Sequence, residues 1–129
     1  MKEKLQGAVF SSVILLIVIL LFTVIDHSIH GLEKAWGVPD YYFRNKIPAG
    51  FLWGIVGLLL ARKIQSIWLK ALVVAGVIAF TLQVRYFTEG FALDFVLLFL
   101  LIHFAILYFL SAGMFWVFNR YNRKITIKT

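Results

Sequence analysis

Two acids and two histidines lie close together near the end of the first apolar stretch, where their spacing could form a metal site. The four residues are Asp26, His27, His30 and Glu33. Spacings of three and four residues put side chains on one face of a helix, so imidazole and carboxylate groups could bind the same ion. Such ligands suit zinc, iron or manganese. The pattern is a candidate site for a divalent metal ion. The alternatives are a pH-sensitive role and ordinary interfacial residues at a helix end.

His103 is a second candidate because it lies within the longest apolar stretch of the chain. Counted from Phe91, it lies about 18 Å along that stretch, near the middle of a hydrocarbon core of about 30 Å. An ionisable residue inside a membrane span is a hypothesis for a functional site. Three roles stay open: a neutral histidine bonded to a backbone carbonyl, a proton relay or substrate contact, and haem ligation with a second ligand from a partner.

Arg85 and Asp94 bracket a short predicted turn, and we expect them to pair across it. An acid inside a span is costly unless it is paired or hydrated, which favours this ion pair. A wider hypothesis is that polar residues at one depth line a single outer cavity. Its members are Asp26, His27, His30, Lys46, Gln83, Arg85 and Asp94.

These residues belong to a chain that is too apolar for an ordinary soluble domain. Of its 129 residues, 62% are hydrophobic and 15% are charged, whereas soluble domains are about 45–50% apolar and about 25% charged. The absence of cysteine excludes disulfide frameworks and cysteine-ligated metal sites. A membrane helix needs about 20 mostly apolar residues. We therefore predict an all-α integral membrane protein, a single-domain four-helix bundle over residues 1–129, with spans at about 5–25, 47–61, 67–84 and 91–118.

The connection over residues 26–46 is too long for a structureless loop in a compact protein, and its pattern predicts an amphipathic cap on the outer surface. An apolar helical stripe runs through Ile25, Ile29, Leu32 and Trp36. The first helix is therefore expected to continue past the membrane edge and to stop near Pro39.

The basic residues predict how the chain is oriented. With the N-terminus inside, nine of the 13 lysines and arginines fall in inner segments and four in outer segments. The positive-inside rule then predicts a multi-pass protein of the cell or inner membrane with both termini cytoplasmic. The net charge of +7 is explained by this topology and by attraction to anionic lipids, so we expect no nucleic-acid partner.

Small residues recur at helical spacing on the second and third predicted spans. They are Gly50, Gly54 and Gly57, followed by Ala71, Ala75 and Ala79. Small side chains let membrane helices approach closely. The stripes predict either packing of the two spans against each other or a seam between copies in a homo-oligomer.

The chain contains no nucleotide-binding or nucleophile motif. Whether it is an enzyme stays open, its catalytic residues are unknown, and the sequence favours a non-enzymatic role. We expect an accessory or assembly subunit of a larger membrane complex in the lipid bilayer. The alternatives are a small oligomeric transporter or lipid translocator, and a metal-dependent membrane enzyme that uses the outer Asp/His/Glu cluster. Beyond a divalent metal ion, no cofactor is expected.

Overall fold

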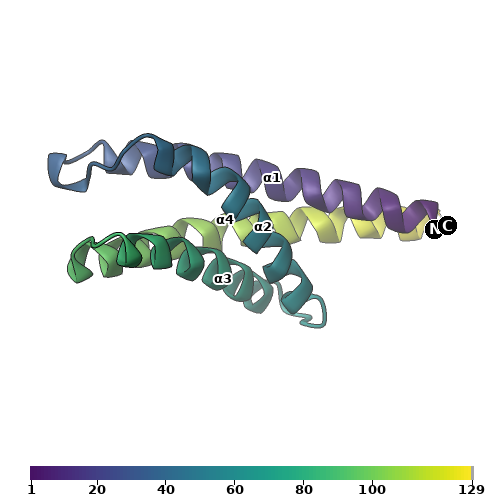
Figure 1. Ribbon diagram of the computed structural model, residues 1–129. Coiled ribbons are helices and arrows are strands. Elements are labelled where there is room, and N and C mark those ends of the chain that lie inside the picture. The colour runs from purple at the N-terminus through teal and green to yellow at the C-terminus, as the bar shows by residue number, and fades with distance from the viewer. Residues whose placement is uncertain (129) are drawn as a thin grey trace.

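The computed structural model describes residues 1–128, with side chains described through residue 125. The chain is all-α, as predicted, and Figure 1 shows its helices in order. They are α1 (Lys2–His30), the short 3-10 helix η1 (Lys34–Trp36), α2 (Tyr41–Ala61), α3 (Ile67–Thr88) and α4 (Leu93–Lys128). Three of them are long and apolar enough to cross a membrane, namely α1, α3 and, over Leu93–Ile125, α4. The chain is therefore a membrane protein with three candidate spans.

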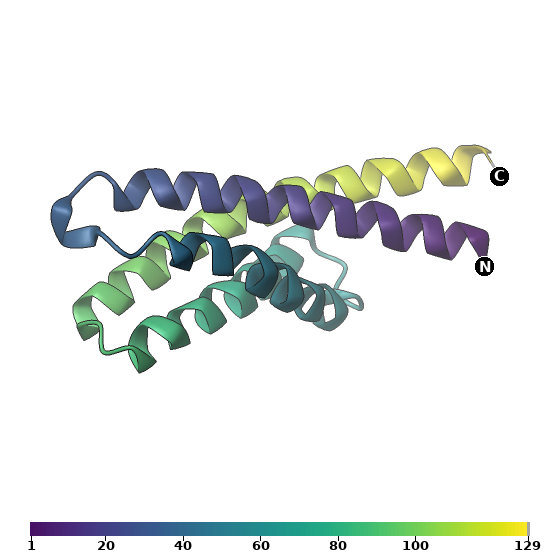
Figure 2. The ribbon, with the colours of Figure 1, turned by 45° about the horizontal axis from the view of Figure 1, so that its top comes forward.

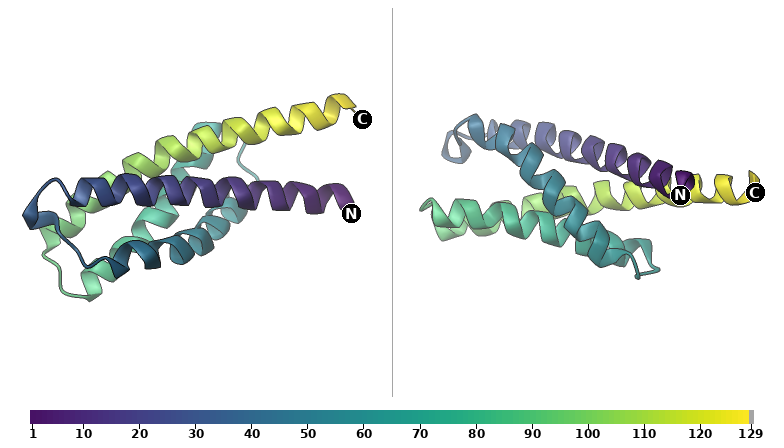
Figure 3. Two further views of the ribbon diagram at one scale, coloured as in Figure 1. Left: turned by 90° about the horizontal axis from the view of Figure 1, so that it is seen from above. Right: turned by 45° about the vertical axis from the view of Figure 1, so that its right-hand side comes forward.

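The helices run alternately in opposite directions (Figures 1 and 2). Both termini lie at one end of the molecule, and the α1–α2 and α3–α4 connections lie at the other end, which we call the connection end (Figure 3). Helix α1 packs against α2 and α4, and α3 packs against the same two helices. With 29 and 36 residues, α1 and α4 are about 44 and 54 Å long, beyond the roughly 30 Å of a hydrocarbon core. They extend past the α2–α3 connection (Figure 2).

Helix α2 begins earlier than the predicted span over residues 47–61 and includes two cations in its first six residues, Arg44 and Lys46. It is outside the group of candidate spans, so a fourth crossing stays a prediction. Pro48 lies inside the helix and not in its first turn. A proline removes a backbone hydrogen bond and crowds the preceding turn, which bends a helix. Helix α2 changes direction along its length (Figure 1).

The predicted cap over residues 26–46 is only partly a surface segment. Helix α1 continues to His30, and the chain then passes through η1 to the start of α2 at Tyr41. Tyr42 and Phe43 belong to α2 and are buried. The helix starts at Tyr41 because the backbone N–H groups of Tyr42 and Phe43 donate to the carbonyls of Pro39 and Asp40, which form the turn that precedes it.

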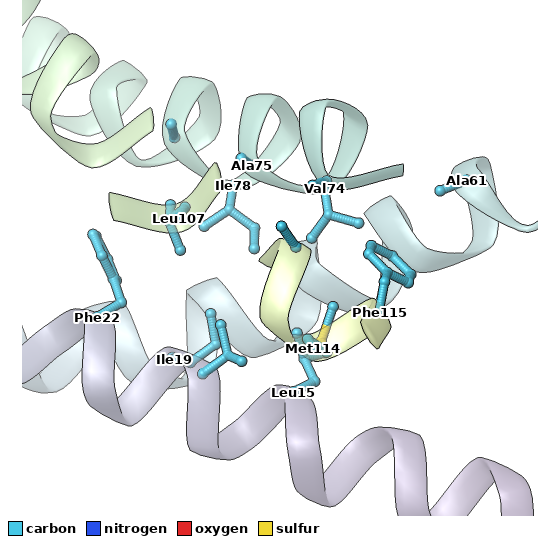
Figure 4. Packing of buried hydrophobic residues seen from close by; sticks show 14 of the residues in the cluster. Leu15, Ile19, Phe22, Ala61, Val74, Ala75, Ile78, Leu107, Met114 and Phe115 are labelled. Carbon is cyan, nitrogen blue, oxygen red and sulfur yellow. The ribbon is translucent and has the colours of Figure 1, made fainter. Parts of the chain in front are cut away.

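The half of the core toward the termini is apolar. Leu15 and Ile19 from α1 face Val74 from α3, together with Leu107 and Met114 from α4 (Figure 4). Each of these side chains is at most 2% exposed. In a membrane, such close packing supplies the attraction between helices that water supplies elsewhere.

The small-residue stripes pack inside this core. A Cβ atom added at Gly54 would lie 2.8 Å from Leu15 Cδ1, and one at Gly57 would lie 3.1 Å from Val74 Cα. The three alanines of α3 are fully buried: Ala71, Ala75 and Ala79. The stripes therefore serve contacts of α2 with α1 and α3 within one chain, and an oligomer that uses another surface stays a prediction.

Candidate metal centre

A cluster of buried polar side chains lies toward the connection end, and all four helices contribute to it. Asp26 comes from α1, Lys46 from α2, Gln83 from α3 and His103 from α4. Asp26 and His103 are fully buried, and the other two are 4% exposed. Charged groups inside an apolar bundle are costly unless they are paired. The contacts among these side chains therefore decide whether the helices can meet here.

Asp26 is the centre of the cluster. Its Oδ2 accepts a hydrogen bond from the Lys46 ammonium group. Its Oδ1 lies 2.7 Å from His103 Nε2 and 3.4 Å from His30 Nε2. One carboxylate thus meets a cation and two imidazole rings.

Each histidine ring is held in place through its other nitrogen. His30 Nδ1–H donates to the backbone carbonyl of Trp36 at 2.6 Å, and because a carbonyl only accepts, this nitrogen carries the proton. His103 Nδ1 lies 2.6 Å from the side-chain amide nitrogen of Gln83. In both rings the outer contact turns Nε2 toward Asp26. A metal-ligating histidine donates its other ring N–H to such a partner, as His30 does. His103 Nδ1 instead accepts from the Gln83 amide, and its Nε2–H donates to Asp26 Oδ1.

The proton on His30 Nδ1 has a consequence for the opposite side of the ring. In the neutral ring Nε2 is an acceptor, and it has no hydrogen-bond donor among the described residues. It lies 3.4 Å from Asp26 Oδ1, which is also an acceptor. Two acceptors repel unless a cation lies between them. Either a second proton on His30 or a metal ion removes this repulsion.

The three potential ligand atoms are close enough for a single ion. The carboxylate of Asp26 and one nitrogen each from His30 and His103 lie within 4.8 Å of one another, and all three residues are buried. Zinc binds such nitrogen and oxygen atoms at about 2.0–2.2 Å. The group could therefore hold a metal ion after small movements of its side chains.

Two residues of the predicted metal site lie elsewhere. His27 is exposed and its ring contacts Phe43, with centroids 4.7 Å apart. Glu33 is exposed and precedes η1. Residues 26 and 30 share a face of α1, whereas residue 27 is about 100° further round. Because α1 ends at His30, Glu33 leaves that face altogether.

Arg85 and Asp94 do not form the expected ion pair with each other. Arg85 Nε donates to Glu89 Oε1 at 3.0 Å, one turn further along α3. Asp94 is exposed, and its Oδ1 accepts from the backbone N–H of Phe95 at 2.9 Å. The nearer acid on the same helix therefore pairs with Arg85, and Asp94 serves the first turn of α4.

Lys46 and Gln83 are members of the predicted outer cavity, whereas His103 is predicted near the middle of the hydrocarbon core. That depth was counted along its own apolar stretch. The helices differ in length and are offset along the bundle, so His103, ten residues into α4, meets Asp26, which lies four residues before the end of α1. The available signals for this contact were a single histidine in α4 and a single acid at the end of the uncharged stretch of α1.

Neither a family model, nor a curated protein, nor a solved structure matches this chain. The case for a function therefore rests on the geometry of the cluster. That geometry brings together one carboxylate, two oriented imidazoles and one lysine where four helices meet.

Proposed function

We propose that this chain is a membrane-embedded metal-binding protein that holds one divalent transition-metal ion through Asp26, His30 and His103. The observation that carries the proposal is the approach of two oriented Nε2 atoms to one buried carboxylate oxygen. Two nitrogens and one oxygen suit Zn²⁺, and the same set with open positions is also used for Fe²⁺. Zn²⁺ is the first candidate because this ligand set is common for it.

Gln83 supports the proposal through an acceptor that has no partner. His103 Nε2 can bind a metal only when the ring proton is on Nδ1, and Nδ1–H then needs an acceptor. The Oε1 atom of Gln83 is buried without a hydrogen bond, and rotating the amide by about half a turn presents it to Nδ1–H. Gln83 and the Trp36 carbonyl would then hold the two rings in the same way.

A second candidate is the accessory role expected from the sequence. It is favoured by Lys46, whose ammonium group already neutralises Asp26. In that case the cluster is an internal clamp that joins four helices, and the chain supplies surfaces to a larger membrane complex or to further copies of itself.

The other two roles from the sequence analysis have less support. Between the cluster and the ends of α1 and α4 at the termini, the described side chains of the buried core are apolar except for Thr23, whose hydroxyl donates to the Ile19 carbonyl, and Ser111. These two hydroxyl groups give a transporter no continuous polar route. A metal-dependent enzyme would use the same three ligands, with a fourth position for water or substrate.

We infer further that α2 is a fourth crossing and that both termini are cytoplasmic. The antiparallel order of the helices agrees with four crossings (Figure 2). The excess of basic residues on the side of the termini agrees with this orientation.

Metal content tests the proposed function. The protein is purified in detergent, stripped with a chelator, reloaded with Zn²⁺ or Fe²⁺, dialysed and analysed for metal. We expect about one ion per chain in the wild type, and loss of that ion in His30→Ala and in His103→Ala. His27→Ala is the matched control, because it removes an exposed imidazole one residue away from Asp26.

Folding and ligation are separated by two further measurements. Helix content is followed by circular dichroism in every variant, and the visible spectrum of bound Co²⁺ reports on nitrogen and oxygen ligands directly. Wild-type protein that takes up no metal would overturn the proposal. So would folded His30→Ala and His103→Ala variants that bind as much metal as His27→Ala.

A further inference from the structure

A small cavity lies between α2 and α3, and Lys46 lines it, whereas none of the three proposed metal ligands does. Its volume is about 80 Å³. One water molecule takes about 10–15 Å³ of such space, so the cavity has room for several waters or one small polyatomic ion. Its polar lining residues are Asn45, Lys46, Thr81, Arg85 and Tyr86.

The charge of this lining favours an anion. Lys46 and Arg85 are cations, and the lining contains no acid. Asp26 pairs with Lys46 from outside the lining. Glu89 pairs with Arg85 from outside the cavity, but the two side chains are 37% and 39% exposed. Ion pairs that are this exposed hold their partners weakly, so Arg85 stays available to a second anion.

Lys46 has more hydrogen-bond donors than its protein partners use. An ammonium group has three N–H bonds, and the structure gives this one a single hydrogen bond, to Asp26. The rings of Phe43 and Tyr86 lie 5.1 and 5.2 Å from Nζ. These rings favour the positive charge, but they do not replace an oxygen acceptor. Because Lys46 is only 4% exposed, its remaining donors need a partner within the protein.

Tyr86 has a similar unmet requirement. Its side chain is 1% exposed and also lines the cavity. Its hydroxyl group is buried and has no hydrogen-bond partner among the side chains and backbone that the structure describes. Buried polar groups are rarely left unpaired. Tyr86 and Lys46 line the same cavity, so a ligand held there is a candidate acceptor for both side chains.

We propose that this cavity binds a phosphate group, with Lys46 and Arg85 opposing its charge and Tyr86 donating a hydrogen bond to it. A phosphate offers several acceptor oxygens at once, which matches donors that converge from α2 and α3. The group can belong to an anionic lipid headgroup or to free phosphate. Tyr42 and Trp53 also line the cavity, and such aromatic side chains are typical of the headgroup level of a membrane. The site goes beyond the proposed metal centre and shares none of its three ligands.

Binding of two probes to the full chain tests this site and separates the sources. Metal-free protein in a neutral detergent is titrated with inorganic phosphate, and protein in nanodiscs is examined by native mass spectrometry for retained phosphatidylglycerol against phosphatidylcholine. We expect Arg85→Gln and Tyr86→Phe to weaken the bound probe about tenfold. Arg62→Gln is the matched control, since it removes an exposed cation in the α2–α3 connection.

Each outcome decides the proposal. Binding of inorganic phosphate that is lost in Arg85→Gln supports a site for the free ion, and retention of phosphatidylglycerol alone with the same loss supports a lipid site. If neither probe binds, or if Arg85→Gln and Arg62→Gln weaken binding equally, the proposal is wrong. Tyr86→Phe keeps the ring and the packing, so it tests the hydroxyl in a folded protein. Metal content is measured in the same samples, so failure of the metal centre is seen separately.

Discussion

At the scale of single residues, Asp26 decides what the end of the bundle can do. Its carboxylate is fully buried, forms an ion pair with the Lys46 ammonium group and lies next to the imidazole rings of His30 and His103. The same carboxylate belongs to the proposed metal centre and to the ion pair with Lys46. In both roles, the stability of the fold depends on a cation that neutralises the buried charge of Asp26. The carboxylate requires such a cation because the apolar side chains around it supply no charge and no hydrogen-bond donor.

This dependence predicts a specific result for charge removal. We expect Asp26→Asn and Lys46→Met each to lower the free energy of unfolding by about 3–5 kcal/mol, because each leaves one buried charge without its partner. The double variant should recover most of this loss, since neither charge remains. Denaturation in mixed micelles, followed by circular dichroism, measures all three. The exposed pair is the control, and Glu89→Gln should cost at most about 1 kcal/mol.

The double variant is the informative one. If it is as unstable as the sum of the single variants, Asp26 and Lys46 act independently and the ion pair is not the clamp at this end of the bundle.

At the scale of helices, different kinds of side chain hold the two ends of the core together. Toward the termini, the glycines of α2 allow this helix to pack closely against both α1 and α3. Toward the connection end, the polar cluster lies beside a second buried hydrophobic cluster of Tyr42, Tyr86 and Val96. A substitution that separates α2 from α3 should therefore also disturb Lys46 and Gln83, which lie on these two helices.

Gly57 is the position where this can be measured. Its added Cβ would lie 3.1 Å from the backbone Cα of Val74, so Gly57→Ala requires the backbone of α3 to move by a few tenths of an ångström. We expect a lower melting temperature, although alanine favours helix by about 1 kcal/mol over glycine. Gly113→Ala is the control because nothing lies within 4 Å of its added Cβ, and it should be neutral or stabilising. Equal melting temperatures for the two variants would contradict the close contact.

The helices could be predicted from sequence more completely than the cluster. Apolar stretches of about 20 residues specify membrane helices directly, and the polar stripe correctly brought Asp26 and His30 to one face of α1. His103 could not be assigned to them, because its contact with Asp26 depends on the lengthwise offset of α1 and α4, which no local spacing encodes. The start of α2 at Tyr41 could not be predicted for a related reason, since tertiary contacts bury Tyr42 and Lys46 in a segment whose pattern predicts a surface cap.

At the scale of the whole molecule, the question is how many times the chain crosses the membrane. Helices α1, α3 and α4 have the length and composition of spans, and α2 does not meet the same criterion. Yet α2 runs antiparallel to its neighbours within the bundle (Figure 3). Its cations fall at one end, where Lys46 is neutralised by Asp26, and the remainder from Ile47 to Ala61 carries no charge.

Labelling of introduced cysteines distinguishes four crossings from three, because the chain has no native cysteine. We expect Glu33→Cys and Glu89→Cys to react with an impermeant maleimide on intact cells, and Lys63→Cys to react only after permeabilisation. These positions lie in the α1–α2 connection, at the start of the α3–α4 connection and in the α2–α3 connection. If α2 does not cross, Lys63→Cys reacts from outside and Glu89→Cys becomes protected. Such reversed labelling of Lys63→Cys and Glu89→Cys would contradict the fourth crossing. Glu33→Cys is outside in both cases and serves as the control for orientation.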